Sequence, residues 1–402
     1  MLGRYSAHPG FIVETSMPNI ISIEPHIFHV SGKTNWFFVA VILDNGLTGW
    51  GEASLNSWEP MIEKMINENL SHLAGLSLQE AQGRLKVSPR SPGGLVMAAA
   101  VSAIQQSLCD LEAQVAGLPL FRILGDQQRD RVPVYANINR ATSVRTPQGF
   151  VDLAAKAKKD GFEAFKIAPF DGVFPWNCNT NEGQEKIKKG LDCILAVSDF
   201  LGPHDRLMVD CHWRFDEKNA INALSLLKKI PLFWFECPIA ETYENWEAMR
   251  NIKKLANEQN TLIAAAESQI GLSSFEMLIQ EKLYDVIMPD VKYCGGPKEL
   301  MAISVAAHKA GVHFAPHNPT GPICHFQSLQ VCASSPACMY LEMQYDESPL
   351  FDAVVSTKSV VIEKSVLRVP QGVGLGVQIN NELLKTHPYK RVPPGIDTIL
   401  NA

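Results

Sequence analysis

The sequence lacks several features that would place it in a membrane, in an oxidising compartment or on a nucleic acid. No run of eighteen or more consecutive apolar residues is present, which argues against a membrane-spanning helix. The nine cysteines form an odd set with no Cys-x-x-Cys pair and no zinc-like spacing, so we expect reduced thiols in a cytoplasmic protein. The formal net charge of -6 provides no basic surface for nucleic acid, and an anionic substrate would need a local cation.

A Gly-x-Gly-x-x-Gly motif that opens a helix after a first strand is also absent, which argues against a doubly wound nucleotide-binding sheet. After residue 131 the chain instead alternates short apolar runs with amphipathic helical stretches. Strands that are buried on both faces have this apolar character, so the pattern predicts a parallel barrel surrounded by helices. The eight runs are VPVYANI, FEAFKIA, RLMVD, LFWFE, LIAAAE, VIMPD, VHFAPH and MYLEM.

The rest of the chain predicts a second, smaller module, because 402 residues are too many for one compact core. Residues 20–130 have an α+β pattern: strand-like FHVSG and WFFVAVILD, a turn at 44–46, a short strand that ends at Trp50, and a helix over 97–116. We assign residues 131–350 to the barrel and residues 1–19 to a loose arm. Residues 351–402 are too short for a core of their own, so we expect them to pack back on the N-terminal module.

Six polar side chains fall at or near the C-terminal ends of different predicted strands. In a parallel barrel this face carries the active site. A single carboxylate at such a position is more often a helix cap or an ion-pair partner, but six at equivalent positions indicate a catalytic site. The six are Asp210, Glu236, Glu267, Asp290, His317 and Glu342.

Three carboxylates from consecutive strands, Asp210, Glu236 and Glu267, suit a hard divalent cation. Mg²⁺ prefers oxygen ligands in octahedral geometry and leaves positions open for substrate oxygens. The alternative is a buried acidic cluster held by Lys or Arg, which would leave mutual repulsion to neutralise. We therefore expect a magnesium site on these three residues.

Acid and base candidates lie on the same face of the predicted barrel. A carboxylate such as Asp290 beside His317 would orient the imidazole and raise its basicity, which makes a general base near neutral pH. His212 lies two residues after Asp210, so the two side chains point the same way from the end of a strand. His212 is thus an acid or base candidate beside the metal.

Two cations are candidates for contact with the substrate. Lys166 lies in mid-strand between Phe165 and Ile167, where a surface lysine is unexpected. Near a metal-bound carboxylate it could stabilise developing negative charge. Arg214, in DCHWRF, is a second candidate that could reach an anionic or hydroxyl group.

Five motifs in order resemble the mandelate racemase subgroup of the enolase superfamily, over the chain from about residue 20. They are VDCHWRF, FWFECP, AAAESQ, PDVKYCGG and APHNPTGPI. The resemblance implies a (β/α)7β barrel closed by an α+β capping domain that is formed from both chain ends. It also implies one Mg²⁺ on the three carboxylates and a His317–Asp290 pair that removes the α-proton. Glu342 would donate a hydrogen bond to the substrate carboxylate, and Lys166 would contact the same group.

Two positions depart from the racemase pattern. Ala168 stands where the racemases carry the second lysine of a Lys-x-Lys pair, which is their base on the opposite face. With His212 on that side, the arrangement is similar to acid-sugar dehydratases of the galactonate dehydratase type, in which this histidine protonates the departing 3-hydroxyl. Cys237 stands where the family commonly has the second glutamate of Glu-Glu-Pro, which alters the hydrogen bonding expected around the metal ligands.

Loops over the barrel mouth are expected to select the substrate. Residues 31–36 and 54–60 lie where the family's specificity loops lie, and surface loop is an equally good interpretation for each candidate within them. Those candidates for sugar contact are Lys33, Asn35, Asn56 and Trp58. Residues 171–182 look like an insertion that could fold over the mouth and bring Trp176 onto a sugar ring.

Together, these residues and the resemblance imply a Mg²⁺-dependent dehydratase of an aldonate- or uronate-type acid sugar. Loss of the C2 proton and then of the 3-hydroxyl would yield a 2-keto-3-deoxy sugar acid. Two alternatives stay open: a racemase or epimerase of a hydroxy acid or amino-acid derivative, and a protein that kept the fold without activity. We expect a small-molecule carboxylate as the ligand, no nucleic acid or membrane partner, and a symmetric homo-oligomer.

Overall fold

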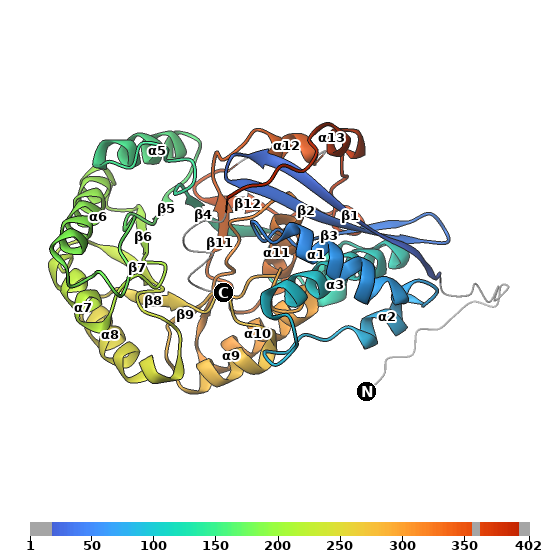
Figure 1. Cartoon of the computed structure of the whole chain (residues 1–402), viewed down its shortest axis with the longest axis horizontal. Helices are drawn as coiled ribbons and strands as arrows, with labels where there is room; N and C mark the ends of the chain where they lie inside the picture. Colours follow the sequence, from blue (N-terminus) through green and yellow to red (C-terminus); the bar gives the residue numbers. More distant parts are fainter. Residues whose placement is uncertain (1–17, 356–361, 394–402) are drawn as a thin grey trace.

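The computed structural model describes residues 18–355 and 362–393. Most of the predicted N-terminal arm, residues 1–17, lies outside these ranges. Figure 1 shows a barrel ringed by helices next to a smaller module that is built on an antiparallel sheet. The predicted α/β class, a barrel with an α+β capping module, is confirmed.

The capping module is a three-stranded antiparallel sheet with helices packed on it, and the predicted FHVSG strand is only the last part of a longer one. The strands are β1 (Ile20–Ser31), β2 (Thr34–Leu43) and β3 (Thr48–Glu52). The helices are α1 (Glu59–Met65), α2 (Leu78–Arg84), α3 (Gly94–Ala116) and α4 (Leu120–Leu124), with single π and 3₁₀ turns at Ile66–Leu70 and Ser71–Leu73.

The long helix α3 forms the centre of the capping module, where it packs on β2 and β3. Gly49 and Gly51 of β3 allow this close approach, because a Cβ atom at either position would overlap the backbone of Ser107 or Ala103. By length and composition α3 could cross a membrane, but 72% of its most apolar stretch is buried inside the protein. It is therefore a core helix of this fold.

Eight parallel strands form the barrel, in the order β10-β9-β8-β7-β6-β5-β4-β11. A parallel bridge from Phe314 of β10 to Cys338, three residues before β11, brings the two ends of that order together. The strands are β4 (Arg131–Asn137), β5 (Ala164–Ile167), β6 (Arg206–Asp210), β7 (Leu232–Glu236), β8 (Leu262–Ala265), β9 (Val286–Ile287), β10 (His313–Phe314) and β11 (Leu341–Gln344). The helices between them are α5 (Pro147–Lys159), α6 (Asn181–Phe200), α7 (Glu217–Leu226), α8 (Trp246–Glu258, after a 3₁₀ turn at Tyr243–Asn245), α9 (Gly271–Gln280), α10 (Pro297–Ala310) and α11 (Pro322–Ser334). This is the predicted (β/α)7β arrangement.

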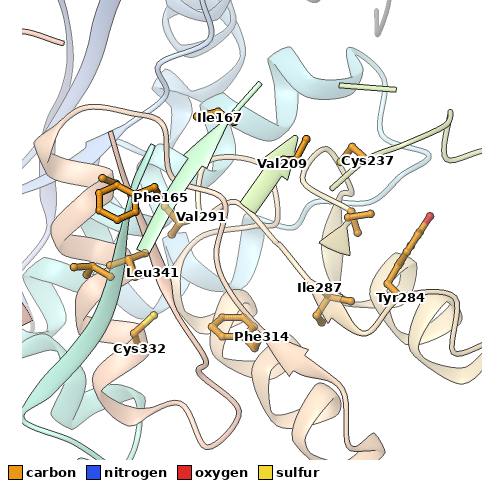
Figure 2. Close-up of a cluster of buried hydrophobic side chains, with 14 of the residues drawn as sticks. Phe165, Ile167, Val209, Cys237, Tyr284, Ile287, Val291, Phe314, Cys332 and Leu341 are labelled. Carbon is orange, nitrogen blue, oxygen red and sulfur yellow. The ribbon is translucent and has the colours of Figure 1, made fainter. Parts of the chain in front are cut away.

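Side chains alternate along each strand between the lumen and the surrounding helices. In β5, Phe165 and Ile167 belong to the apolar layer outside the strands (Figure 2). Lys166 lies between them in the strand, so it points into the barrel. In β6, Val209 lies in the same layer (Figure 2). Asp210 is the next residue of the strand, so it points inward. A separate apolar cluster fills the lumen nearer the N-terminal ends of the strands: Tyr135, Ala164, Met208, Trp234, Ala264, Val286, Met288 and Ala315.

The described C-terminal residues touch both parts of the molecule. Helix α12 (Leu350–Val354) follows β11, and β12 (Val366–Arg368) pairs antiparallel with the start of β4. Helix α13 (Asn381–Thr386) contacts β1, and the carbonyl of Lys390 accepts a hydrogen bond of 2.9 Å from the Asn35 amide. This segment therefore runs from the first barrel strand to the capping sheet.

Candidate active site

Three carboxylates converge at the C-terminal ends of neighbouring barrel strands. Asp210 ends β6, Glu236 ends β7 beside it in the register, and Glu267 follows β8. One oxygen of each carboxylate lies within 4.8 Å of the others, and all three residues are buried. Hard divalent cations prefer oxygen ligands, so this group can hold such a cation.

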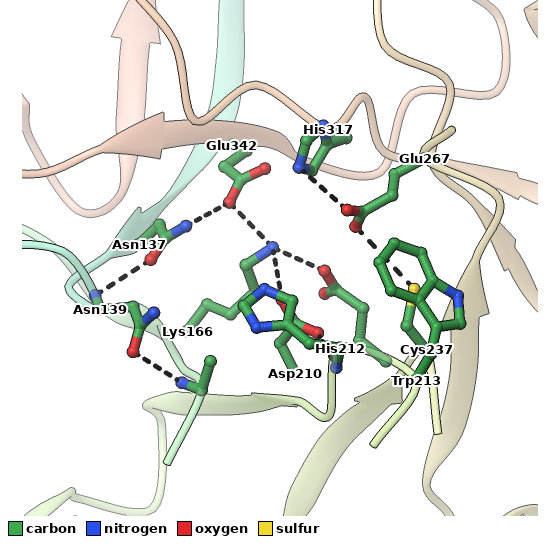
Figure 3. Close-up of polar contacts among 12 residues, drawn as sticks. Asn137, Asn139, Lys166, Asp210, His212, Trp213, Cys237, Glu267, His317 and Glu342 are labelled. Atoms are coloured by element: carbon green, nitrogen blue, oxygen red, sulfur yellow. Dashed lines mark hydrogen bonds and ion pairs between the residues drawn. The ribbon is translucent and has the colours of Figure 1, made fainter. Parts of the chain in front are cut away.

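The charge balance around this group also favours a cation. The Lys166 ammonium lies 2.6 Å from Glu236 and 2.8 Å from Glu342, and it is 3.9 Å from Asp210 (Figure 3). Burial and the neighbouring carboxylates hold the pKa of Glu236 and of Glu267 well above its usual range. With Asp210, Glu236, Glu267 and Glu342 all ionised, Lys166 alone could not balance the negative charge, so ionisation of the raised-pKa pair is favoured by a bound cation.

His317 and Asp290 form a hydrogen-bonded pair on the same face. His317 Nδ1 lies 2.8 Å from Asp290 Oδ2. Its Nε2 lies 3.5 Å from Glu267 Oε1 (Figure 3). Burial lowers the pKa of His317, although the hydrogen bond to Asp290 opposes this effect. A neutral imidazole whose Nε2 faces the three carboxylates can accept a proton from a ligand bound beside them.

His212 follows β6, which is four strands away from β10 in an eight-stranded barrel, so it faces His317 across the barrel mouth. Its Nε2 lies 2.8 Å from Asp210 Oδ2, and 24% of its side chain is exposed. His212 and His317 line the same cavity. The fold therefore brings one imidazole to each side of the three carboxylates Asp210, Glu236 and Glu267.

Glu342, which the resemblance implied as a hydrogen-bond donor to the substrate carboxylate, is bonded to protein donors in this structure. Each polar contact of its carboxylate among the described residues is with a donor: Lys166 and the Asn137 amide at 2.8 and 2.7 Å, and the Asn318 N–H at 2.7 Å. Burial alone would raise the pKa of Glu342, but Lys166 and His317 lower it. These contacts hold Lys166 and the loop after β10, and the role of Glu342 toward a substrate carboxylate stays a prediction.

A cavity of about 1060 Å³ lies above these side chains, between the barrel and the capping module. Lys166, His212 and His317 line it from the barrel. Lys33, Asn56 and Trp58 line it from the capping loops, so these three residues remain candidates for contact with a substrate. The volume is at the upper end of the usual range for small-molecule sites, which leaves room for a chain of several hydroxylated carbons.

Three further residues predicted to contact the substrate do not line this cavity, and those predictions are corrected. Asn35 is buried, and its amide is bonded within the capping module and to the C-terminal segment. Arg214 is buried, and its Nη1 donates to the carbonyl of Phe170 at 2.8 Å. Trp176 is 65% exposed and stacks on Phe174, with ring centroids 4.6 Å apart.

Glu241 accepts hydrogen bonds beside Cys237, the residue that stands where the family commonly has a second glutamate. The buried thiol lies 3.6 Å from Glu241 Oε1 and 3.9 Å from Glu267 Oε2. Burial and these two carboxylates raise the pKa of the Cys237 thiol, which argues against a thiolate ligand. Glu241 Oε1 also accepts hydrogen bonds from the Trp213 indole at 2.9 Å and the Ala266 N–H at 3.0 Å. One carboxylate thus joins the loops after β6, β7 and β8.

Two buried charged residues at the site were missed in the sequence analysis. Lys292 lines the cavity, and its Nζ lies 2.6 Å from Asp290 Oδ2. Its position inside the motif PDVKYCGG was the only signal for it in the sequence. Glu52 ends β3 and is completely buried at the start of α11, just after the His317 loop. The signal for Glu52 was a charged residue that ends an apolar, glycine-containing strand, GWGE.

Comparisons with known proteins identify the family of this chain and several relatives. Residues 149–383 match the family model described as enolase C-terminal domain-like, and residues 14–125 match the mandelate racemase/muconate lactonizing enzyme N-terminal domain. A D-galactonate dehydratase from Variovorax paradoxus is 25% identical over 377 residues, which cover 92% of this chain and 94% of that protein. A D-gluconate dehydratase from Thermoproteus tenax is 30% identical over 290 residues, which cover 72% of this chain and 56% of that protein.

A solved structure shares the whole architecture. The 3,6-anhydro-D-galactonate cycloisomerase from Zobellia galactanivorans superposes with a TM-score of 0.79 at 25% identity, covering 92% of this chain and 100% of that one. The two family models together span both the capping module and the barrel. The chain therefore belongs to the mandelate racemase and muconate lactonizing enzyme group of the enolase superfamily.

Proposed function

We propose that this protein is a Mg²⁺-dependent dehydratase of an aldonate- or uronate-type acid sugar. The observation that carries the proposal is the pair of imidazoles, His317 and His212, on opposite sides of the carboxylate group. Ala168 leaves no second lysine beside Lys166, which disfavours proton return from that side by a lysine. The similarity to D-galactonate and D-gluconate dehydratases supports the same reaction class.

Asp210, Glu236 and Glu267 would hold the magnesium ion, because a set of carboxylate oxygens suits this hard cation. When bound there, the ion supplies positive charge that stabilises an enediolate, an effect worth several kcal/mol. Lys166 would contact the substrate carboxylate from the cavity wall and stabilise the same negative charge.

His317 would remove the proton from C2. Its Nδ1 is bonded to Asp290, so the free electron pair lies on Nε2, which faces the cavity. The C2–H bond breaks, and its electrons pass into the enediolate. His212, whose Nε2 lies 2.8 Å from Asp210 Oδ2, would then give a proton to the 3-hydroxyl. The C3–O bond breaks, water leaves, and the resulting enol takes up a proton at C3 and releases its hydroxyl proton to form the 2-keto-3-deoxy acid.

A screen of acid sugars with Mg²⁺ for formation of 2-keto acids tests this proposal. We expect His212→Asn to slow elimination of the best substrate by about 100-fold or more, because general acids typically contribute this much. Exchange of the C2 proton with solvent deuterium should persist in this variant, because His317 is intact. His204→Asn, at an exposed histidine outside the cavity, is the matched control.

Each outcome of these assays has a distinct meaning. Unchanged elimination in His212→Asn would refute the acid role of His212. Exchange at C2 without a keto-acid product would favour a racemase or epimerase. Neither exchange nor turnover across the library would favour a protein without activity. We also propose a cytoplasmic location and a homo-oligomeric state, and light scattering measures the latter.

A further inference from the structure

Lys292 is a charged residue at the cavity that the reaction above does not use. It lies two residues after Asp290, and 2% of its side chain is exposed. Its Nζ lies 2.6 Å from Asp290 Oδ2, and its backbone N–H donates to Oδ1 of the same carboxylate at 2.8 Å. His317 Nδ1 contacts the same Oδ2 at 2.8 Å. Lys292 and His317 are therefore neighbours through a single carboxylate oxygen.

The Lys292 ammonium has more donors than the protein uses. An ammonium carries three N–H donors, and among the described residues its one hydrogen-bond acceptor is Asp290. It also lies over the face of the Tyr293 ring, whose centroid is 5.0 Å away. Lys292, Tyr293 and His317 all line the cavity. A buried donor without an acceptor is unfavourable, so the remaining N–H groups require acceptors from the cavity.

We infer that Lys292 is a specificity-determining residue that donates a hydrogen bond to a substrate hydroxyl on the His317 side of the cavity. The inference rests on the proposed function, because it takes a hydroxylated acid as the ligand. C2 must lie at His317 for its proton to be removed, so the neighbouring carbons of the substrate lie close to Lys292. Asp290 already balances the ammonium charge, which favours a neutral hydroxyl over a second carboxylate or a phosphate as the acceptor.

A hydroxyl contact and a purely structural role of Lys292 predict different patterns. If Lys292 only holds Asp290 in place, its replacement slows the reaction of every substrate by the same factor. If it binds one hydroxyl, its replacement has little further effect on a substrate from which that hydroxyl is missing. The comparison of substrate analogues therefore separates the two roles.

The experiment measures exchange of the C2 proton with solvent deuterium in the Mg²⁺-loaded enzyme, for the best acid sugar and its 3-, 4- and 5-deoxy analogues. We expect wild-type kcat/KM to be about 100-fold lower for one analogue than for the parent acid, as for a site built to bind a hydroxyl. Lys292→Met should slow the parent by about 100-fold and that analogue by about threefold or less, so that the discrimination is lost. Lys292→Gln keeps an N–H donor and should retain discrimination of about tenfold.

Two results would overturn this inference. One is an equal loss for the parent and all three analogues in both variants, which would make Lys292 a positioning residue for Asp290. The other is a wild-type enzyme that exchanges C2 protons but discriminates against none of the analogues. A wild-type enzyme that exchanges no acid sugar at all would instead refute the proposed function, and the inference with it. Lys292→Gln decides the question if Lys292→Met does not fold.

Discussion

Four residues beside the three carboxylates have backbone conformations that are rare for residues with a side chain. The φ angle is 48° at His212, 56° at Trp213, 44° at Cys237 and 83° at Ala266. Each of these residues lies within three positions of one of the predicted metal ligands. Left-handed conformations cost about 1 kcal/mol or more each and persist where the surrounding structure enforces them. These turns end the strands sharply and direct three carboxylates to one point.

His325, on α11, provides a prediction about stability and pH. It is 1% exposed, its Nε2 has no hydrogen-bond partner among the described residues, and burial lowers its pKa to about 4 from a normal value of 6.5. Between these two values the unfolded chain binds more protons than the folded chain, so stability is lost as the pH falls from 6.5 toward 4. The full shift corresponds to about 3 kcal/mol.

Urea unfolding at pH 7 and pH 4.5 measures this effect. On acidification, the free energy of unfolding of the wild type should fall by about 2 kcal/mol more than that of His325→Gln, which cannot titrate. His204→Gln, at an exposed position, should behave like the wild type. The same loss in the wild type and His325→Gln would contradict the assignment of a suppressed pKa.

At the scale of elements, a carboxylate from the capping sheet caps a helix of the barrel. Glu52 accepts hydrogen bonds from the Thr320 hydroxyl at 2.6 Å and from the N–H groups of Gly321 and Cys324 at 2.8 and 2.9 Å. A negative charge at the start of α11 is favourable, and α11 follows the loop that carries His317. Ser54 donates to the same carboxylate at 2.6 Å and lines the cavity. Glu52 therefore connects the capping loop that carries Ser54 to the loop that carries His317, the proposed base.

Replacement of Glu52 by Gln should disturb the position of His317 while the shape of the side chain is kept. The groups around Glu52 all donate hydrogen bonds to its carboxylate. The NH2 of a Gln amide cannot accept them, so at least one hydrogen bond to α11 is lost. We expect kcat to fall about tenfold or more. The matched control is Glu80→Gln, which alters the capping box that Glu80 forms with Ser77 on α2, outside the cavity. Equal kcat values for the two variants would argue against the coupling.

At the scale of the whole molecule, the predicted metal ligands come from three different strands of the barrel. Asp210 ends β6, Glu236 ends β7, and Glu267 follows β8, so a cation bound to them joins these three strands. The three carboxylates are brought together only in the folded chain. A bound cation should therefore stabilise the fold by mass action.

Removal of divalent metal with EDTA should abolish dehydration and lower the Tm, and Mg²⁺ should restore both. At a concentration 100 times its Kd, Mg²⁺ should add about 2.7 kcal/mol to the free energy of unfolding. Because the pKa of Glu236 and of Glu267 is raised in the metal-free protein, binding should release protons, and affinity should rise with pH. Calorimetry in two buffers of different ionisation enthalpy measures this release. Glu267→Gln should lose the Tm increase, and an unchanged wild-type Tm would contradict the site.

Much of the barrel and the metal-ligand candidates could be predicted from the sequence, because both depend on local patterns. A short apolar strand followed by a polar residue is recognisable within a single stretch, as in LFWFE with Glu236. Parallel strands place all their C-terminal ends on one face, so eight local patterns combine into one site without further information. The position of Lys166 in the lumen follows in the same way from the alternation with Phe165 and Ile167.

The roles that were missed or wrong depend on contacts between residues far apart in the chain. Glu342 is an acceptor because Asn137, 205 residues away, and Lys166 donate to it. Glu52 lies at the site because Thr320, 268 residues away, donates to it. By itself the sequence determined which residues end the barrel strands, since that pattern is local. Only the tertiary structure decided which of the charged side chains face the cavity and which are held by neighbours, because the packing of distant elements sets their partners.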